Sequence, residues 1–195
     1  MFFIHQLGFT MSINANDTQT SYSLTSKILH WVMAVLVMLM FFAFLGFKEA
    51  NTDAKKIEML MGHSSIGAMI TFLVVIRIYN TFINKAPKPQ HNIKRWQLSA
   101  SSISHKLLYA LLIFVPITGM LTARAHELPV LMFGSFNLSN SQSYVAESFA
   151  SIKSLHVAGI YTLMIVLFAH IGAALLHKFV LKDQVFASMW RSKNK

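Results

Sequence analysis

Three histidines occupy one apolar segment of the chain, SLHVAGIYTLMIVLFAHIGAALLHKF. His156 and His170 are 14 residues apart, and His177 follows seven residues later. Over 14 helical residues the chain turns through about 1400°, so the second side chain lies within about 40° of the first and about 21 Å further along the axis. The spacing therefore predicts two imidazoles on one helix face at two depths. Imidazole nitrogens are common ligands of transition metals.

Other apolar segments carry histidines at the same two depths. His63 matches the depth of His156, and His30 matches that of His170. Two imidazoles from different helices suit the iron of a b-type haem, which takes two axial ligands and needs no covalent cysteine. The chain has no cysteine, which excludes thiolate zinc sites, iron–sulfur clusters and thioether-attached haem.

An arginine within an apolar segment supports this interpretation. Arg77 follows His63 by 14 residues, so it faces the same side and reaches the depth of His170. A cation inside a membrane span is costly and usually faces a partner in the bundle interior. A haem propionate at the inner haem is the expected partner. Glycines that follow the histidines closely are expected to let a flat macrocycle approach the backbone: Gly67, Gly159 and Gly172.

Two further histidines have two readings each. His177 lies on nearly the same face as His170, about 10 Å nearer the cytoplasm, and beside Lys178. It is either an interfacial residue or a hydrogen-bonding partner for a quinone headgroup. His105 either serves that same site or braces an inner propionate. The histidines outside the spans are expected to be surface residues: His5, His91 and His126.

Three alternatives compete with haem. A histidine beside a tryptophan, as at His30, is often a plain interfacial anchor. A bare transition-metal transporter is also built from imidazoles, but it usually adds carboxylates or thiolates, and the span cores hold no Asp or Glu. A purely structural bundle gives no reason for histidines matched in depth.

The elements that position these residues are membrane helices. Of 195 residues, 54% are hydrophobic and only 12% charged, about half the charged share of a soluble domain. Four segments reach the roughly 20 apolar residues that cross a bilayer: 28–47, 59–83, 105–123 and 154–181. A shorter run, LPVLMF, is expected at the membrane interface. We therefore predict an all-α, integral membrane four-helix bundle that encloses two b-type haems.

Charge distribution predicts the orientation of the bundle. The parts of the chain on the side of the two termini hold 12 of the 17 Lys and Arg residues, whereas the opposite links hold five. Basic residues accumulate on the cytoplasmic side, so both termini should be cytoplasmic. The formal charge of +10 is explained by this topology, and no nucleic-acid-binding pattern is present. We expect a disordered tail at 1–22, one domain at 23–190 and a basic tail at 191–195.

The ordered set of these pieces resembles the bacterial cytochrome b561 family, which includes superoxide:ubiquinone oxidoreductases. The resemblance covers residues 22–190 and rests on SKILHWVMA, GHSSIGAMI, VVIRIYN, ISHKLLYALLIFVPITGML and the H-x13-H-x6-H pattern of the last span. It implies a dihaem protein of the bacterial inner membrane. The implied axial ligands are His63 and His156 for the outer haem, and His30 and His170 for the inner haem.

The same resemblance implies the substrates. His177 matches a histidine associated with a ubiquinone pocket, and Lys153 and Arg124 match basic residues of the outer face that attract an anion. The expected reaction is oxidation of superoxide on the outer side and reduction of ubiquinone on the inner side. The outer links hold five acidic against five basic residues, so charge count alone does not reveal a basic entrance. The main rival is a non-catalytic electron-transfer subunit that docks a partner dehydrogenase or a soluble cytochrome.

Overall fold

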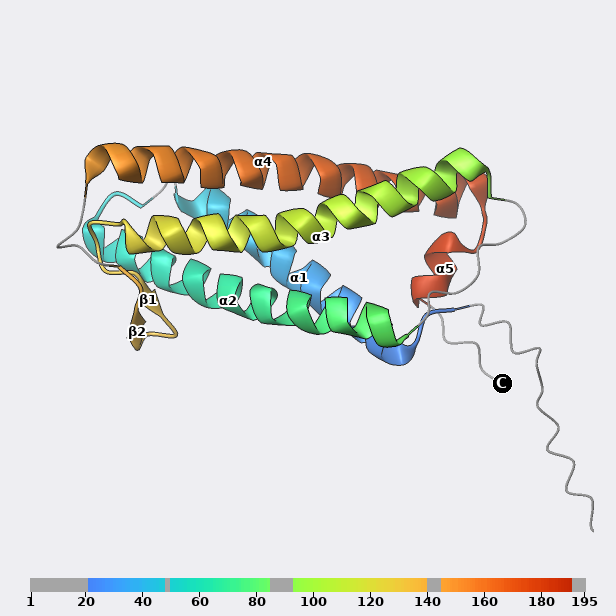
Figure 1. The fold of residues 1–195 in the computed structure, drawn as a ribbon, viewed down its shortest axis with the longest axis horizontal. Coiled ribbons are helices and arrows are strands. Elements are labelled where there is room, and N and C mark those ends of the chain that lie inside the picture. The colour runs from blue at the N-terminus through green and yellow to red at the C-terminus, as the bar shows by residue number, and fades with distance from the viewer. Residues whose placement is uncertain (1–20, 48–49, 85–92, 140–144, 191–195) are drawn as a thin grey trace, which may run out of the picture.

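Four long antiparallel helices make up the bundle in the computed structural model (Figure 1). The structure describes residues 21–47, 50–84, 93–139 and 145–190. The helices are α1 (Leu24–Gly46), α2 (Asp53–Ile83), α3 (Arg95–Arg124) and α4 (Ala146–Leu176). All four are long and apolar enough to cross a membrane, which confirms the predicted number of spans and the helical fold class.

Each helix begins before the predicted span because a polar first turn precedes the apolar stretch. Side-chain caps define two of these starts: the Ser23 hydroxyl accepts from the Ser26 amide, and the Thr52 hydroxyl accepts from the Lys55 amide. At the start of α3, the Lys94 amide donates to the Gln97 side chain at 2.9 Å. The predicted spans cover the apolar parts of the helices, and the polar residues before them extend each helix at its N-terminal end.

The buried cluster of apolar side chains lies between α1 and α2, and aromatic rings bridge α1 and α4. Met33 of α1 and Ile70 and Val74 of α2 form the buried core. The C-terminal half of α1 is joined to the middle of α4 by ring contacts, Phe41 with Phe168 and Phe44 with Tyr161. Most other large apolar side chains are exposed, as is expected where lipid surrounds the helices.

Short elements close both ends of the bundle. Strands β1 (Leu131–Met132) and β2 (Phe136–Asn137) form an antiparallel hairpin at the end where α1 and α3 finish. We call this end the hairpin end. At the opposite end, α4 continues into a π-helical turn, η3 (His177–Leu181), followed by α5 (Val185–Trp190). The predicted tails lie largely outside the described residues, although the Tyr22 amide donates to the Ser188 carbonyl of α5.

The LPVLMF run forms the hairpin and packs on α2, which the sequence did not indicate. Val130 is only 2% exposed, and its carbonyl accepts from the Leu138 amide at 2.8 Å. Two adjacent serines of α2 hold the hairpin: Ser64 donates to the Leu131 carbonyl, and Ser65 accepts from the Phe133 amide. The run is therefore a small folded cover on the end of α2.

Candidate functional site

Two predicted ligands meet near the hairpin end. The rings of His63 on α2 and His156 on α4 have centroids 6.3 Å apart. An imidazole nitrogen binds a transition metal at about 2 Å and its ring centroid lies about 1 Å behind, so two rings on opposite sides of one ion have centroids about 6 Å apart. The observed separation fits two axial ligands of one iron.

His156 is oriented as a ligand should be. Its Nδ1 lies 3.0 Å from the Val115 carbonyl and 3.1 Å from the Thr118 hydroxyl. A carbonyl only accepts, so Nδ1 carries the hydrogen and Nε2 keeps its lone pair. Metal-binding histidines usually donate their second ring nitrogen to a carbonyl or carboxylate in this way. Pro116 lies next to Val115 and interrupts the hydrogen-bond ladder of α3, because proline has no amide hydrogen.

His63 has a buried nitrogen without a partner. Its Nδ1 makes no hydrogen bond to the described residues. Buried polar atoms are nearly always paired, so an orphaned ring nitrogen marks a position where a further group is expected. The chemistry of the two rings therefore fits the iron of a haem.

A cavity of about 550 Å³ surrounds this pair. Its walls come from all four helices and are largely apolar, and its volume lies in the usual range of about 300–1,000 Å³ for ligand sites. A side chain at Gly119 would place Cβ only 2.9 Å from the His156 ring. Gly119 thus lets α3 approach the ligand. Gly159 serves a different purpose from the predicted one, since its missing side chain makes room for Phe114 on α3.

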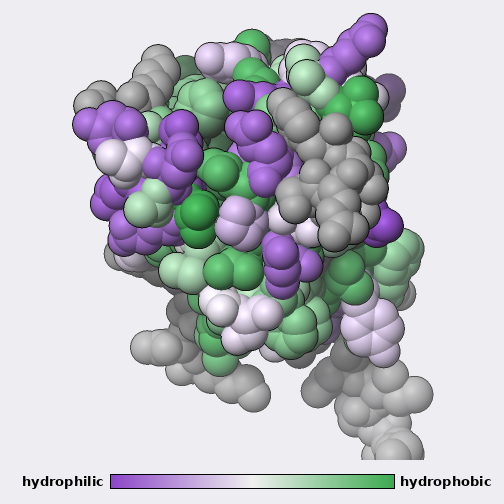
Figure 2. Space-filling model, turned by 90° about the vertical axis from the view of Figure 1, so that its left-hand side faces the viewer, coloured by the Kyte–Doolittle hydropathy of each residue, from purple (hydrophilic) through white to green (hydrophobic). Residues whose placement is uncertain are grey.

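The entrance of the cavity is basic. Lys56, Lys153 and His126 belong to the lining, and no Asp or Glu occurs among the described lining residues. Asp53, on the first turn of α2, pairs with Lys56 at 3.0 Å. Hydrophilic side chains cover much of this end of the molecule (Figure 2). Lys153 lies over the ring of Phe149, which also contacts the ring of His126. Arg124 ends α3 as an exposed residue and is not one of the lining residues.

His126 is not the plain surface residue that the sequence suggested. It is half-buried, and its Nδ1 accepts from the Leu128 amide at 3.0 Å. Burial lowers the pKa of His126 below its usual value of 6.5, and Lys153 and Lys56 act in the same direction. The ring is therefore neutral at neutral pH, and the positive charge of the entrance comes from the two lysines.

Three imidazoles gather at the other depth. The His170 ring on α4 lies 6.4 Å from the His30 ring on α1 and 5.3 Å from the His105 ring on α3. The distance between His30 and His170 again suits two ligands of one metal. His105 was predicted to serve the quinone site or to brace an inner propionate, and neither role required its ring to contact the His170 ring. Its Nδ1 is 3.4 Å from the Ser101 hydroxyl on the preceding turn.

Arg77 is tied into this inner cluster. Its guanidinium donates to the Tyr109 hydroxyl at 3.0 Å, to the Ser26 carbonyl at 3.1 Å and to Nδ1 of His30 at 3.3 Å. Arginine only donates, so this nitrogen of His30 is the acceptor and the neutral ring carries its hydrogen on Nε2. For His30 to hold iron through Nε2, Arg77 would have to release Nδ1, and its guanidinium could then hold a carboxylate of the cofactor.

His177 lies apart from this cluster, in η3. Its Nδ1 is 2.5 Å from a carboxylate oxygen of Asp183, and both side chains are largely buried. This neighbour was not predicted. Sequence reasoning also missed other polar partners, although some carry a signal: Tyr109 follows His105 by four residues and Asn80 follows Arg77 by three, so each pair shares a helix face. Asn80 donates to the Ser26 hydroxyl at 2.7 Å.

Four membrane-capable helices with imidazoles paired across the bundle define a class of protein, the helical membrane cytochromes. The family description Prokaryotic cytochrome b561 matches residues 21–192, which is most of the chain. The chain therefore belongs to the prokaryotic cytochrome b561 family. It is a bacterial membrane cytochrome of electron transfer, and the family implies b-type haem.

Two relatives from Escherichia coli (strain K12) are similar along nearly their whole lengths. Cytochrome b561 homolog 2 is 26% identical over 174 residues, which cover 89% of this chain and 93% of the relative. Cytochrome b561 homolog 1 is 25% identical over 170 residues, covering 86% and 96%.

Proposed function

We propose that this chain holds two b haems and passes electrons from superoxide, on the side of the hairpin end, to ubiquinone near the opposite end. The proposal rests on one observation: two histidine pairs lie at two depths of one bundle, with ring centroids 6.3 Å apart in one pair and 6.4 Å apart in the other. His63 and His156 are the proposed ligands of the outer haem, and His30 and His170 those of the inner haem.

Haem, when bound, supplies the one-electron redox centres. The chain supplies the remaining functions. The Val115 carbonyl and Thr118 hydroxyl orient His156, and the apolar cavity excludes water around the outer pair. At the inner pair, Arg77 would bind a propionate once it leaves His30. His105 is proposed to brace the inner haem or the neighbouring quinone site, which its short distance from His170 supports.

The choice of an anionic donor rests on the entrance. Lys56 and Lys153 are cations on the lining of the cavity. Lys56 pairs with Asp53 at 3.0 Å, so Lys153 carries most of the argument for an anion. Such a site raises the local concentration of a small anion such as superoxide. Arg124, exposed on the same end, is proposed to contribute at longer range. The basic residues near α5 and the termini support a cytoplasmic location for both termini in the bacterial inner membrane.

The quinone end is proposed at His177. Ubiquinone reduction takes up two electrons and two protons, so two superoxide ions are oxidised to two dioxygen molecules for each quinol formed. Protons from the cytoplasmic side balance the reaction. An imidazole near the lipid–water boundary can hydrogen-bond a quinone oxygen and deliver such a proton.

A stopped-flow experiment tests this function directly. The purified, haem-loaded protein is mixed with superoxide, and the haem absorption band of the reduced form is followed; a short-chain ubiquinone is then added. We expect reduction by superoxide, then reoxidation by the quinone, and a haem-to-protein ratio near two. No reduction by superoxide, together with a redox protein that co-purifies and reduces the haem, would instead establish the electron-transfer subunit.

A further inference from the structure

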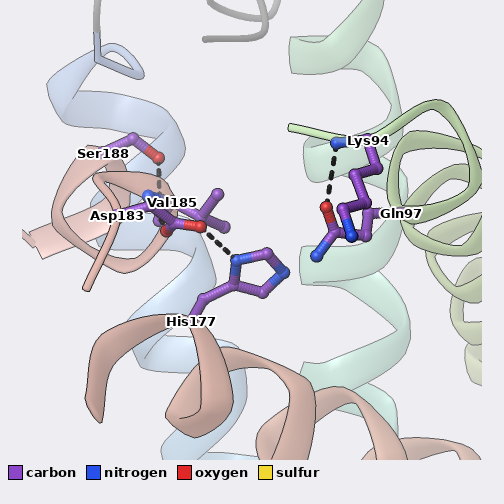
Figure 3. A network of polar contacts seen from close by, with 6 residues as sticks. All are labelled: Lys94, Gln97, His177, Asp183, Val185 and Ser188. Carbon is purple, nitrogen blue, oxygen red and sulfur yellow. Dashed lines mark hydrogen bonds and ion pairs between the residues drawn. The ribbon is translucent and has the colours of Figure 1, made fainter. Parts of the chain in front are cut away.

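A buried acid and base lie together where the last membrane helix ends. His177 and Asp183 have side chains only 14% and 18% exposed, and 2.5 Å separates Nδ1 from a carboxylate oxygen (Figure 3). No other histidine of the described residues forms an ion pair with a carboxylate. An acid–base contact this well shielded from water at a membrane boundary calls for a physical reason.

A reversal of the chain after η3 brings Asp183 back to His177. After η3, Lys182 adopts a left-handed conformation with φ of 51°, which reverses the chain. The Asp183 amide then donates back to the His177 carbonyl. The second carboxylate oxygen of Asp183 accepts from the Val185 amide at 3.0 Å and caps α5. One carboxylate therefore both starts α5 and orients the imidazole.

Asp183 also borders a second cavity. This space of about 350 Å³ lies between η3 and α5 and is lined by Lys178, Lys182 and Trp190 in addition to Asp183. The Trp31 indole donates to the Met189 carbonyl and so fixes α5 against α1. The carboxylate thus stands between the imidazole and a cavity wide enough for water. The other ring nitrogen, Nε2, faces away from Asp183 (Figure 3).

We propose that Asp183 and His177 form a proton-delivery pair for quinone reduction, an inference that rests on the proposed function. Asp183 is the positioning residue: its carboxylate holds Nδ1–H, which directs Nε2–H toward a quinone oxygen. When electrons reach the quinone, Nε2 gives up its proton to that oxygen and the ring becomes neutral. Nδ1 keeps its hydrogen on Asp183, and a proton from the cytoplasmic side then reloads Nε2. Each quinol requires two such deliveries.

The test is a single-turnover reoxidation of dithionite-reduced protein by a short-chain ubiquinone, in H₂O and in D₂O. Asp183→Asn keeps an oxygen for the Val185 amide but removes the negative charge. We expect it to slow reoxidation about 10- to 100-fold, with an unchanged half-saturating quinone concentration and a larger solvent isotope effect. Asp183→Glu should recover most of the rate. Ser188→Ala, which removes only a hydroxyl bound to the Val185 carbonyl, is the matched control in α5.

The outcomes separate this inference from the proposed function. If wild-type protein does not reduce the quinone, both are wrong. If wild type reduces it and Asp183→Asn does so at the same rate and with the same isotope effect, only the proton-delivery pair is wrong. Loss of the haem spectrum in both the Asn and Glu variants would assign Asp183 a purely structural role and also overturn the inference.

Discussion

At the scale of single residues, the hydrogen on each imidazole decides what that imidazole can bind. His156 donates to the Val115 carbonyl and is ready to bind a metal, whereas His30 accepts from Arg77 and must first be released. The two proposed haem sites therefore differ in whether the histidine already presents a free lone pair on Nε2. At the outer site His156 could hold iron without changing its hydrogen bond, whereas at the inner site His30 would first have to lose its contact with Arg77.

The substitution Gly119→Ala adds one methyl group beside the outer site and tests whether that site holds a haem. Gly119→Ala places Cβ 2.9 Å from the His156 ring, which is held in place by Val115 and cannot move freely. We expect the haem-to-protein ratio, measured as pyridine haemochrome, to fall from near two toward one. Gly62→Ala is the control, because a side chain there meets nothing within 4 Å. Both changes raise helix propensity by about 1 kcal/mol, so an equal ratio in the two variants would contradict the prediction.

His126 should make the protein less stable in acid. Burial lowers its pKa from 6.5, so the unfolded chain takes up the proton first as pH falls, and the free energy of unfolding decreases below about pH 6.5. In His126→Gln the side chain can still accept from the Leu128 amide. The melting temperature of this variant should fall less than that of the wild type between about pH 7.5 and 5.5. The half-exposed position limits the difference to below about 1 kcal/mol. Parallel melting curves would contradict this assignment.

At the scale of elements, the hairpin and the helix ends hold the site in shape. Met132 of β1 and the residues that flank the hairpin, Val130 and Leu138, belong to the wall of the cavity around the outer pair. The turn depends on two consecutive residues of positive φ, Phe133 at 53° and Gly134 at 70°. Only glycine adopts this region without strain.

Gly134→Val should loosen this cover. A β-branched residue at φ of 70° costs about 1–2 kcal/mol, and that cost falls on a hairpin of only two residue pairs. We expect faster limited proteolysis between the two strands and easier access of added imidazole to the outer haem, with the inner haem spectrum unchanged. Ser135→Ala, at the next position, changes no backbone requirement and should behave as wild type.

At the scale of the whole molecule, charge and lipid surroundings set the direction of the reaction. The apolar outer faces of α1 to α4 orient the bundle across the membrane. The two lysines of the entrance then face the side on which we place the anionic donor, and the acid–base pair of η3 lies toward the other side. In the proposed function, the two ends are linked only by electron transfer through the haems.

Replacing Lys56 and Lys153 together with Gln should slow haem reduction by superoxide by several-fold to about 10-fold, and should weaken its dependence on ionic strength. The rate with a neutral reductant should stay the same. Lys55→Gln is the control for Lys56→Gln alone: each change removes one charge and one ion pair, with Glu58 or Asp53, but only Lys56 lines the cavity. An equal effect of the control would attribute the loss to net charge rather than to the entrance.

The sequence by itself determined the properties that depend on one helix at a time. Hydropathy located four spans, and the helical rise placed His156 and His170 at two depths, because both quantities are local to a segment. Tertiary structure alone decided the contacts across helices. The approach of Gly119 to His156 and the placement of Lys56 and Lys153 on one cavity depend on how helices rotate about their axes. The contact of Asp183 with His177 depends on the chain reversal at Lys182. Residue spacing within one helix carries no information on those rotations.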